Sequence, residues 1–235
     1  MSIKAVLFDL DGTLLPMDQD EYLKAYFKGL ATKMAPAGFA PKPLINAVWA
    51  GSEAMIKNDG RRSNEEVFWK SFVEVLGDKV LSNKHLLDDF YLNEYEEIKS
   101  ICGYREESKQ MINLLKSKGI RVILATNPLF PAVATEHRIR WAGLEPEDFE
   151  LYTTYENIGY CKPNLEYYRD ILRRCNLAAQ DCLMVGNDVD DDMVTTNLGM
   201  QTYLLTNDLI NKNNVPLENF THGTAKELLE YFKTL

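Results

Sequence analysis

The chain has 235 residues, of which 46% are hydrophobic and 26% charged, with a formal net charge of -9 and an isoelectric point near 5.0. This composition is typical of a globular protein with a substantial core, and the acidic balance argues against nucleic acid as a partner. No apolar run approaches the roughly 18 residues that a membrane-spanning helix needs, so no membrane partner is expected.

The first predicted element is a buried strand over residues 4–10, KAVLFDL, which Gly12 ends. Two carboxylates, Asp9 and Asp11, lie at its end with one residue between them. Their side chains project to the same side of an extended chain, because side chains alternate along a strand. Like charges held so close repel each other unless a cation or a shared proton compensates them. We therefore expect these acids to serve a binding or catalytic site.

Residues 17–103 have a different character, with about four predicted helices and no strand. One helix is predicted for PLINAVWAGSEAMIKN, residues 43–58, and the others carry apolar stripes at helical spacing. We interpret the stripes and Trp49 as helix–helix core and the basic turn KNDGRR, residues 57–62, as solvated. The alternative is that Trp49 or this turn faces a substrate. The stripes are Leu23, Phe27, Leu30 and Met34; Phe68, Phe72 and Val75; and Leu87, Tyr91, Tyr95 and Ile98.

Helices and strands alternate in the rest of the chain, which predicts a doubly wound α/β core with a parallel sheet covered on both faces. The core would comprise residues 1–16 and 104–235, with residues 17–103 inserted as a helical domain. In such sheets the active crevice lies at the carboxyl ends of the strands. The predicted helices are 105–119, 128–142, 163–176, 190–198 and 224–233, and the predicted strands are 120–127, 149–154, 182–188 and 201–206.

Polar residues gather at the predicted strand ends. A set of acids with a single lysine suits a hard cation such as Mg²⁺ together with a phosphate, because the metal lets carboxylates approach a phosphoryl dianion. The pattern therefore predicts a magnesium and phosphate site. Its members are Asp9, Asp11, Gly12 and Thr13 at and just beyond the end of the first strand, Thr126 and Asn127 at the end of the second, Lys162 before the helix at 163, and Asn187, Asp188 and Asp192 at and beyond the end of strand 182–188.

Four short motifs, DLDGT, ATN, CKP and GNDxxxD, occur in this order and resemble the four motifs of the haloacid dehalogenase (HAD) superfamily. The helical insertion after the first motif resembles the α-helical, C1-type cap of that superfamily. The resemblance spans the whole chain. It implies a Rossmann-like core with a cap domain, and a magnesium-dependent phosphatase that hydrolyses a small phosphomonoester through an aspartyl-phosphate intermediate.

The resemblance also implies a role for each motif residue. Asp9 would be the nucleophile, and Asp11 the general acid and then the general base. Thr126 would hold phosphoryl oxygens, and Lys162 would neutralise charge, assisted by the positive end of the helix at Pro163. Substrate contacts are expected from Gly12, Thr13 and Asn127, the last through its backbone N–H.

Magnesium would be bound by the Asp9 carboxylate, the backbone carbonyl of Asp11 and an acid of the fourth motif. In the commonest family pattern an Asp directly follows the motif glycine, whereas this chain has Asn187 there. Aligned without a gap, Asn187 takes the ligand position; shifted by one residue, Asp188 does. We favour Asp188 because a carboxylate binds Mg²⁺ better than an amide does. Asp192 is the outer acid in either alignment.

Three alternative functions remain open. A phosphomutase of β-phosphoglucomutase type shares all four motifs, and product analysis would separate it from a phosphatase. A dehalogenase uses a similar aspartate nucleophile, but dehalogenating members lack an acid two residues later, so Asp11 argues against it. The last is a phospho-accepting or metabolite-binding regulatory module without turnover. Receiver modules carry their acceptor later in the chain and have no helical insertion of this size.

The remaining expectations concern compartment and partners. The four cysteines form no C-x-x-C pair, the three histidines share no metal-ligand spacing, and no export signal is evident. We expect reduced thiols, no zinc site and a cytoplasmic protein. The expected partner is a small phosphorylated metabolite, and the chain would act as a monomer or a homodimer.

Overall fold

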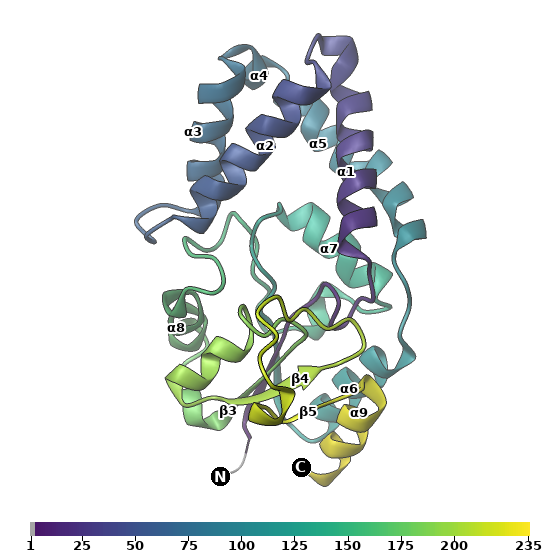
Figure 1. Cartoon of the computed structure of the whole chain (residues 1–235), viewed down its shortest axis with the longest axis vertical. Coiled ribbons are helices and arrows are strands. Elements are labelled where there is room, and N and C mark those ends of the chain that lie inside the picture. The colour runs from purple at the N-terminus through teal and green to yellow at the C-terminus, as the bar shows by residue number, and fades with distance from the viewer. Residues whose placement is uncertain (1–2) are drawn as a thin grey trace.

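A computed structural model describes residues 3–235 and has a five-stranded, fully parallel sheet in its lower half (Figure 1). The strand order is β2-β1-β3-β4-β5, so β1 lies between β2 and β3 and the ends of these three strands fall side by side. Segments far apart in the sequence are thereby brought to one edge. The strands are β1 (Ala5–Phe8), β2 (Arg121–Leu124), β3 (Cys182–Gly186), β4 (Gln201–Leu205) and β5 (His222–Gly223).

Helices cover both faces of this sheet, as the sequence predicts. Val6 and Phe8 of β1 pack toward α6, α7 and α9, whereas Ala5 and Leu7 pack toward α8 on the opposite face. Successive residues of β1 are therefore buried on opposite faces of the sheet. Burial on both faces is typical of a doubly wound fold. The elements are α6 (Glu106–Ser117), α7 (Ala132–Trp141), α8 (Leu165–Arg174) and α9 (Ala225–Thr234), with the 3₁₀ helices η3 (Pro146–Asp148), η4 (Ala179–Asp181), η5 (Met193–Leu198) and η6 (Leu217–Asn219).

The segment between β1 and α6 contains helices and no strand in the described part of the chain. Helices α2 and α3 pack against each other as one arm, whereas α1 packs with α5 and η2 as a second arm (Figure 1). Both arms stand above the carboxyl ends of the strands. The elements are α1 (Gln19–Met34), η1 (Ala35–Ala37), α2 (Pro41–Ile56), α3 (Asn64–Leu76), α4 (Lys79–Ser82), α5 (Lys84–Leu92) and η2 (Glu94–Ile101).

The two connections between this segment and the sheet lie against each other. The backbone N–H of Gly103 donates to the carbonyl of Pro16 at 2.8 Å. An inserted domain is connected to its core by two chain segments, which are expected to lie side by side, as these do. They support the proposal that residues 17–103 form a cap domain on a core of 1–16 and 104–235, a range whose first two residues lie outside the described part.

Two strand expectations differ from the structure. The strand predicted for 149–154 is reduced to a single bridge between Tyr152 and Leu124, beside the β2 edge of the sheet. Conversely, β5 was not predicted because its two residues are too short to produce a periodic pattern.

Three helix expectations also differ at their starts. The helix predicted for 128–142 begins at Ala132, directly after Pro131. The helix predicted for 190–198 is the 3₁₀ helix η5, which begins only at Met193, because the Asp188 side chain accepts the N–H groups of Asp190 and Asp191 and holds them in a turn. The helix expected at Pro163 begins two residues later, where the Asn164 side chain caps it. Its positive end therefore lies farther from Lys162 than the sequence suggested.

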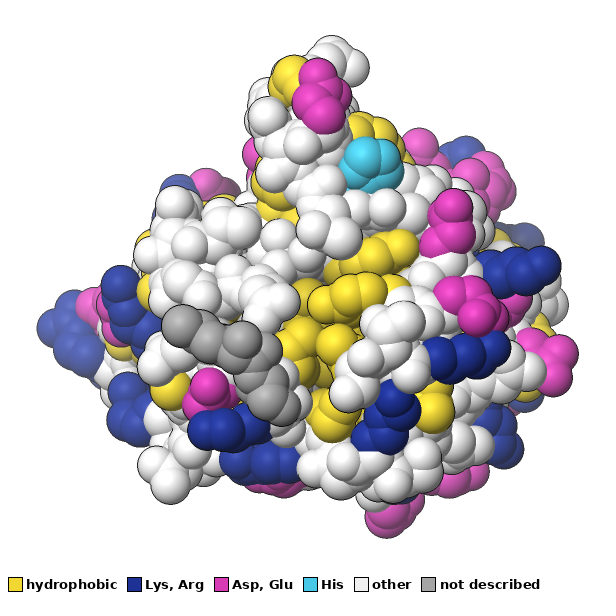
Figure 2. All heavy atoms as spheres, turned by 90° about the horizontal axis from the view of Figure 1, so that it is seen from below, with side chains coloured by type: hydrophobic (Ala, Val, Ile, Leu, Met, Phe, Trp, Pro, Cys, Tyr) yellow, Lys and Arg dark blue, Asp and Glu magenta, His cyan; other side chains and the backbone are white. Residues whose placement is uncertain are grey.

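The face of the core farthest from the cap carries acidic and basic side chains side by side around its rim, with apolar side chains in a central hollow (Figure 2). All four cysteines are free thiols. Among residues 3–235, no helix combines the length and the hydropathy needed to cross a bilayer.

Candidate active site

Asp9 directly follows β1, an interior strand of the sheet, and its side chain is held from two sides. Lys162 Nζ donates to Asp9 Oδ1 at 2.8 Å, and the Thr13 hydroxyl donates to Oδ2 at 3.2 Å. The chain turns at Gly12, where φ is +81° and a Cβ atom would overlap the amide of Asn187. Glycine at this position therefore lets the chain fold back beneath Asp9 and orient its carboxylate.

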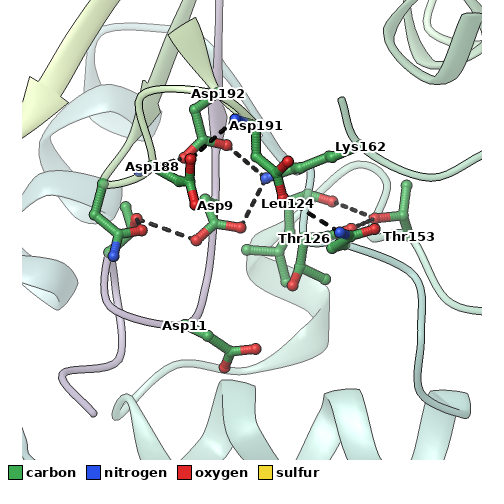
Figure 3. A network of polar contacts seen from close by, with 12 residues as sticks. Asp9, Asp11, Leu124, Thr126, Thr153, Lys162, Asp188, Asp191 and Asp192 are labelled. Carbon is green, nitrogen blue, oxygen red and sulfur yellow. Dashed lines mark hydrogen bonds and ion pairs between the residues drawn. The ribbon is translucent and has the colours of Figure 1, made fainter. Parts of the chain in front are cut away.

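Lys162 bridges two carboxylates at the floor of the site (Figure 3). Its Nζ donates to Asp9 and, at 2.7 Å, to Asp192 Oδ1, and the side chains of Lys162 and Asp192 are 1% and 0% exposed. Burial raises the pKa of Asp192 although Lys162 opposes the shift. Burial also disfavours the charge on Lys162, but the two carboxylates outweigh this and hold its pKa well above the usual range. The lysine therefore stays protonated beside Asp9.

Thr126 and Asn127 follow β2 and face the same cavity as Asp9. The backbone carbonyl of Thr126 accepts hydrogen bonds from the Thr153 hydroxyl at 2.7 Å and the Tyr167 hydroxyl at 2.8 Å, which fix the loop from behind. The Asn127 amide nitrogen lies 3.4 Å from Asp191 Oδ2. Thr153, Tyr167 and Asp191 were missed as site residues, because their contacts depend on tertiary packing.

Asn187, the alternative metal ligand, is committed to holding two loops together. Its Oδ1 accepts the Thr13 hydroxyl at 3.1 Å, and its amide nitrogen donates to the Asp208 carbonyl at 2.6 Å. The residue is 2% exposed. Both ends of the amide are thus engaged in the fold, although Asn187 also lines the cavity.

Asp188, the other candidate ligand, uses only one of its carboxylate oxygens in hydrogen bonds with the described residues. Its Oδ1 accepts the N–H groups of Asp190 and Asp191 at 2.8 and 3.0 Å, and the side chain lines the cavity beside Asp9 (Figure 3). The Asp192 carboxylate accepts the backbone N–H of Asp188 at 3.1 Å and so ties this loop to Lys162. The arrangement supports Asp188 as the fourth-motif ligand and Asp192 as an outer acid.

Gly12 and Thr13, expected at the substrate, lie beneath the site instead. Thr13 is fully buried, and its hydroxyl points toward Asp9 and Asn187. Neither residue is part of the cavity wall. The tight turn that brings the chain under Asp9 also removes both residues from the surface that a ligand can reach.

Asp11 also borders the cavity, but its carboxylate lies apart from the Asp9–Lys162 group (Figure 3). It forms an ion pair with Arg138 Nη1 of α7. The Arg138 side chain is 1% exposed, and its guanidinium lies 4.5 Å from the centroid of the Phe130 ring. Burial raises the pKa of Asp11, and Arg138 opposes this shift. Arg138 therefore influences both the position and the protonation of Asp11.

Arg138 was not predicted as a site residue. The sequence nevertheless contains a signal of its role, because Arg138 has helical spacing to apolar residues. Helix α7 buries Ala134, Arg138 and Trp141, at spacings of four and three, so the arginine lies on the apolar face of the helix. An arginine is seldom fully buried unless it is paired. Its partner could not be named from the sequence, because 127 residues separate the two.

The oxygen atoms around Asp9 determine whether the site can hold Mg²⁺. Among residues 3–235, no three His, Cys, Asp or Glu side chains form a ready metal cluster. The expected set needs only two carboxylates, from Asp9 and Asp188, and the Asp11 carbonyl. That carbonyl and Asp188 Oδ2 accept no hydrogen bond from the described residues. An all-oxygen set with free lone pairs fits Mg²⁺, which usually keeps several water ligands.

The cavity above these groups has a volume of about 560 Å³ and continues upward between the two helical arms. The parallel sheet, the acid-rich crevice at its carboxyl edge and the helical insertion over that crevice define an α/β core with a helical cap over its candidate site. The chain belongs to the haloacid dehalogenase-like hydrolase family, which it matches over residues 3–195. The resemblance inferred from the four motifs is thereby confirmed.

Known proteins of similar sequence span nearly the whole chain. The chain is 26% identical over 212 residues to the glyceraldehyde 3-phosphate phosphatase of Methanothermobacter thermautotrophicus, covering 88% of this chain and 87% of that protein. It is 24% identical over 240 residues to the protein of the same name from Methanocaldococcus jannaschii, covering 99% and 98%. A solved HAD phosphatase from Thermococcus onnurineus shares the fold with a TM-score of 0.62 at 18% identity, covering 97% of each chain.

Proposed function

We propose that the protein is a magnesium-dependent phosphatase that hydrolyses a small phosphomonoester, with Asp9 as the nucleophile. The observation that carries this proposal is the Asp9 carboxylate at the end of an interior strand, fixed by Lys162 and Thr13 at the floor of a large cavity. Family membership makes the chain a hydrolase, and the two archaeal relatives bear the name of a phosphatase.

In the first step an Asp9 carboxylate oxygen forms a bond to phosphorus while the ester oxygen leaves with its electron pair. Water then breaks the resulting acyl phosphate and releases inorganic phosphate, which restores Asp9. The hydrogen bonds from Lys162 and Thr13 fix the carboxylate rotamer before the substrate arrives. The protonated Lys162, with Thr126, stabilises negative charge on the phosphoryl oxygens.

Asp11 is the proposed proton donor to the leaving oxygen and then the acceptor from the attacking water. Two influences act on it in opposite directions. Burial raises its pKa and favours the protonated acid, whereas Arg138 favours the ionised base. A group that must exchange a proton twice in each turnover benefits from this balance.

Magnesium bound to Asp9, the Asp11 carbonyl and Asp188 would supply positive charge that draws a phosphoryl group toward a floor rich in carboxylates. Asp192 connects these groups, since it contacts both Lys162 and the backbone of Asp188. Its buried carboxylate would therefore hold the metal-binding loop against the lysine rather than bind the ion itself.

The proposal predicts inorganic phosphate release from a panel of phosphomonoesters when Mg²⁺ is present. Removal of divalent ions with EDTA should abolish turnover, and added Mg²⁺ should restore it. Phosphate released in a one-to-one ratio to the alcohol establishes hydrolysis, whereas transfer to a sugar would establish the phosphomutase alternative. Turnover that is indifferent to EDTA would refute the role of the metal.

A second prediction concerns the fourth motif. Asp188→Asn should weaken Mg²⁺ binding by about 10–100-fold, because a neutral amide replaces a charged ligand. The new Asn can still accept the N–H groups of Asp190 and Asp191, so the loop should keep its shape. Titration calorimetry with Mg²⁺ alone measures the effect independently of turnover.

The matched control for this variant is Asp190→Asn, which removes an exposed carboxylate two residues away. Asp190 accepts only from the Asn213 amide among the described residues, and its loss should leave the Mg²⁺ affinity nearly unchanged. Equal weakening by both variants would mean that only the overall charge of the loop matters, and Asp188 would lose its assignment as a ligand.

A further inference from the structure

The cavity above Asp9 is much larger than a phosphoryl group requires. Its volume of about 560 Å³ falls in the range of about 300–1,000 Å³ that is typical of pockets for drug-sized ligands. Helices α1, α2, α3 and α5 all contribute to its walls, so it occupies the space between the two arms of the cap. Whatever phosphate ester binds at the floor must place its alcohol portion in this space.

The walls contributed by the cap are mainly aromatic and aliphatic. Phe27 and Tyr91, which the sequence pattern placed in the helix–helix core, line the cavity and are only partly buried. Trp49 is 50% exposed and Ile56 49% exposed, and both line the cavity as well. Trp49 packs on Phe27 of α1, with ring centroids 5.5 Å apart, and also faces the cavity, so the alternative that it faces a substrate stays open. Large apolar side chains grouped in a pocket mark a surface that a ligand covers.

The tyrosine hydroxyls of the cap face one another instead of the cavity. The hydroxyls of Tyr26 and Tyr91 form a hydrogen bond of 2.8 Å, and those of Tyr22 and Tyr95 form a second bond. In each pair one hydroxyl donates to the other, so the two oxygens are directed toward each other. The tyrosine rings thus present apolar surface to a ligand. The polar groups of the cap that line the cavity are few, among them Gln19, Ser52 and the indole N–H of Trp69, so a polyhydroxylated ligand would find partners for only some of its hydroxyl groups, which is costly in a desolvated pocket.

The charges around the cavity are unevenly placed. Lys162 and Lys212, the two lysines that line it, both come from the core, whereas the ionisable residues contributed by the cap are the acids Glu53 and Asp88. The basic turn at 57–62 is not part of the wall. A second anionic group on an alcohol portion held between the arms would face these acids, because the part of the wall contributed by the cap contains no cation.

We propose that the physiological substrate is a phosphomonoester of an uncharged, largely apolar alcohol whose body packs between the two arms of the cap. This inference rests on the proposed phosphatase function and adds the substrate class. A three-carbon sugar phosphate, as in the name of the two archaeal relatives, would leave most of the apolar surface of the arms uncovered.

The test compares two primary alkyl esters, 2-phenylethyl phosphate and glycerol 3-phosphate, with Mg²⁺ present. We expect kcat/KM to be at least about tenfold higher for the phenylethyl ester, because its ring buries apolar surface between the arms. Trp49→Ala should lower the ratio of the two kcat/KM values by about fivefold to tenfold. Trp49 is half exposed, so its truncation should not unfold the cap, which thermal unfolding verifies.

The matched control is Leu92→Ala, which truncates an exposed apolar residue of α5 outside the cavity wall and should leave the ratio unchanged. Binding is measured separately in the Asp9→Asn variant through the fluorescence of Trp49 and Trp69, both in the cavity wall. Preferential binding of the phenylethyl ester without turnover in the wild-type protein would refute the phosphatase but keep the apolar site. Equal or tighter binding of glycerol 3-phosphate, with a ratio insensitive to Trp49→Ala, would overturn the substrate class alone.

Discussion

Replacing Asp9 with Asn should lower kcat for phosphate ester hydrolysis by about 10⁴-fold or more while leaving the fold intact. A carboxamide oxygen is a poor nucleophile and cannot form the acyl phosphate, so the covalent route is lost. Removing the nucleophile is therefore the most damaging change to the reaction that a single substitution can make. Steady-state release of inorganic phosphate measures the loss.

The hydrogen bonds around Asp9 explain why the Asn variant should fold. An Asn in this place keeps an oxygen for Lys162, and its amide group can donate to the Thr13 hydroxyl. That hydroxyl has a second partner in Asn187 Oδ1, to which it can direct its own proton. Every polar atom thus retains a partner, and the unfolding transition should move little.

The control for Asp9→Asn is again Asp190→Asn, which removes one negative charge at a variable position of the fourth motif without touching Asp9. It should retain most of the activity. In rapid-quench experiments the wild-type protein should carry acid-stable phosphate during turnover and the Asp9→Asn variant should carry none. Appreciable activity in the Asp9→Asn variant would transfer the nucleophile to another group or to water.

Local sequence signals were sufficient to predict the strands and the turn that position the candidate active-site residues. The run of apolar residues before Asp9 predicts a buried strand, and Gly12 predicts the turn that follows it. The parallel order then brings Thr126, Lys162 and the 187–192 loop to the same edge. These features follow from strand periodicity and backbone conformation, which depend on near neighbours in the chain.

Features that arise from contacts between distant elements could not be predicted in this way. The contacts of Asn187 with Thr13 and Asp208 favour a structural role for this residue, yet one of these partners is 174 residues away. The aromatic stripes of the cap predicted helices correctly, but Phe27 has the same periodicity whether it packs in a core or lines a cavity. An apolar stripe at helical spacing identifies the apolar face of a helix. It does not show whether that face packs against another helix or lines a cavity.

Removal of Arg138 should have a large effect on the stability of the fold. Arg138→Met should lower the free energy of unfolding by about 3 kcal/mol, because it leaves the Asp11 carboxylate in a largely dry position without its cation. Asp11 retains 22% exposure of its side chain, so the loss should lie at the lower end of the range for buried pairs. Chemical denaturation monitored by circular dichroism measures the change.

The matched control is Arg140→Met, two residues along the same helix. Arg140 is 47% exposed and contacts Glu136 and Glu145 only at 3.4 Å, so its replacement should cost less than about 1 kcal/mol. A comparable loss in both variants would show that helix α7 needs arginine for reasons other than the ion pair.

A double-mutant cycle separates the ion pair from the packing of Arg138 against Phe130. If the pair dominates, Asp11→Asn should offset part of the damage caused by Arg138→Met, because the neutral amide no longer needs a cation, and the coupling free energy should be about 1–3 kcal/mol. If the guanidinium serves only as a packed surface on Phe130, the two losses should add. Coupling would mean that the proposed general acid is held in place by a residue outside the four motifs, so that the stability of the fold and the position of the proton donor depend on the same ion pair.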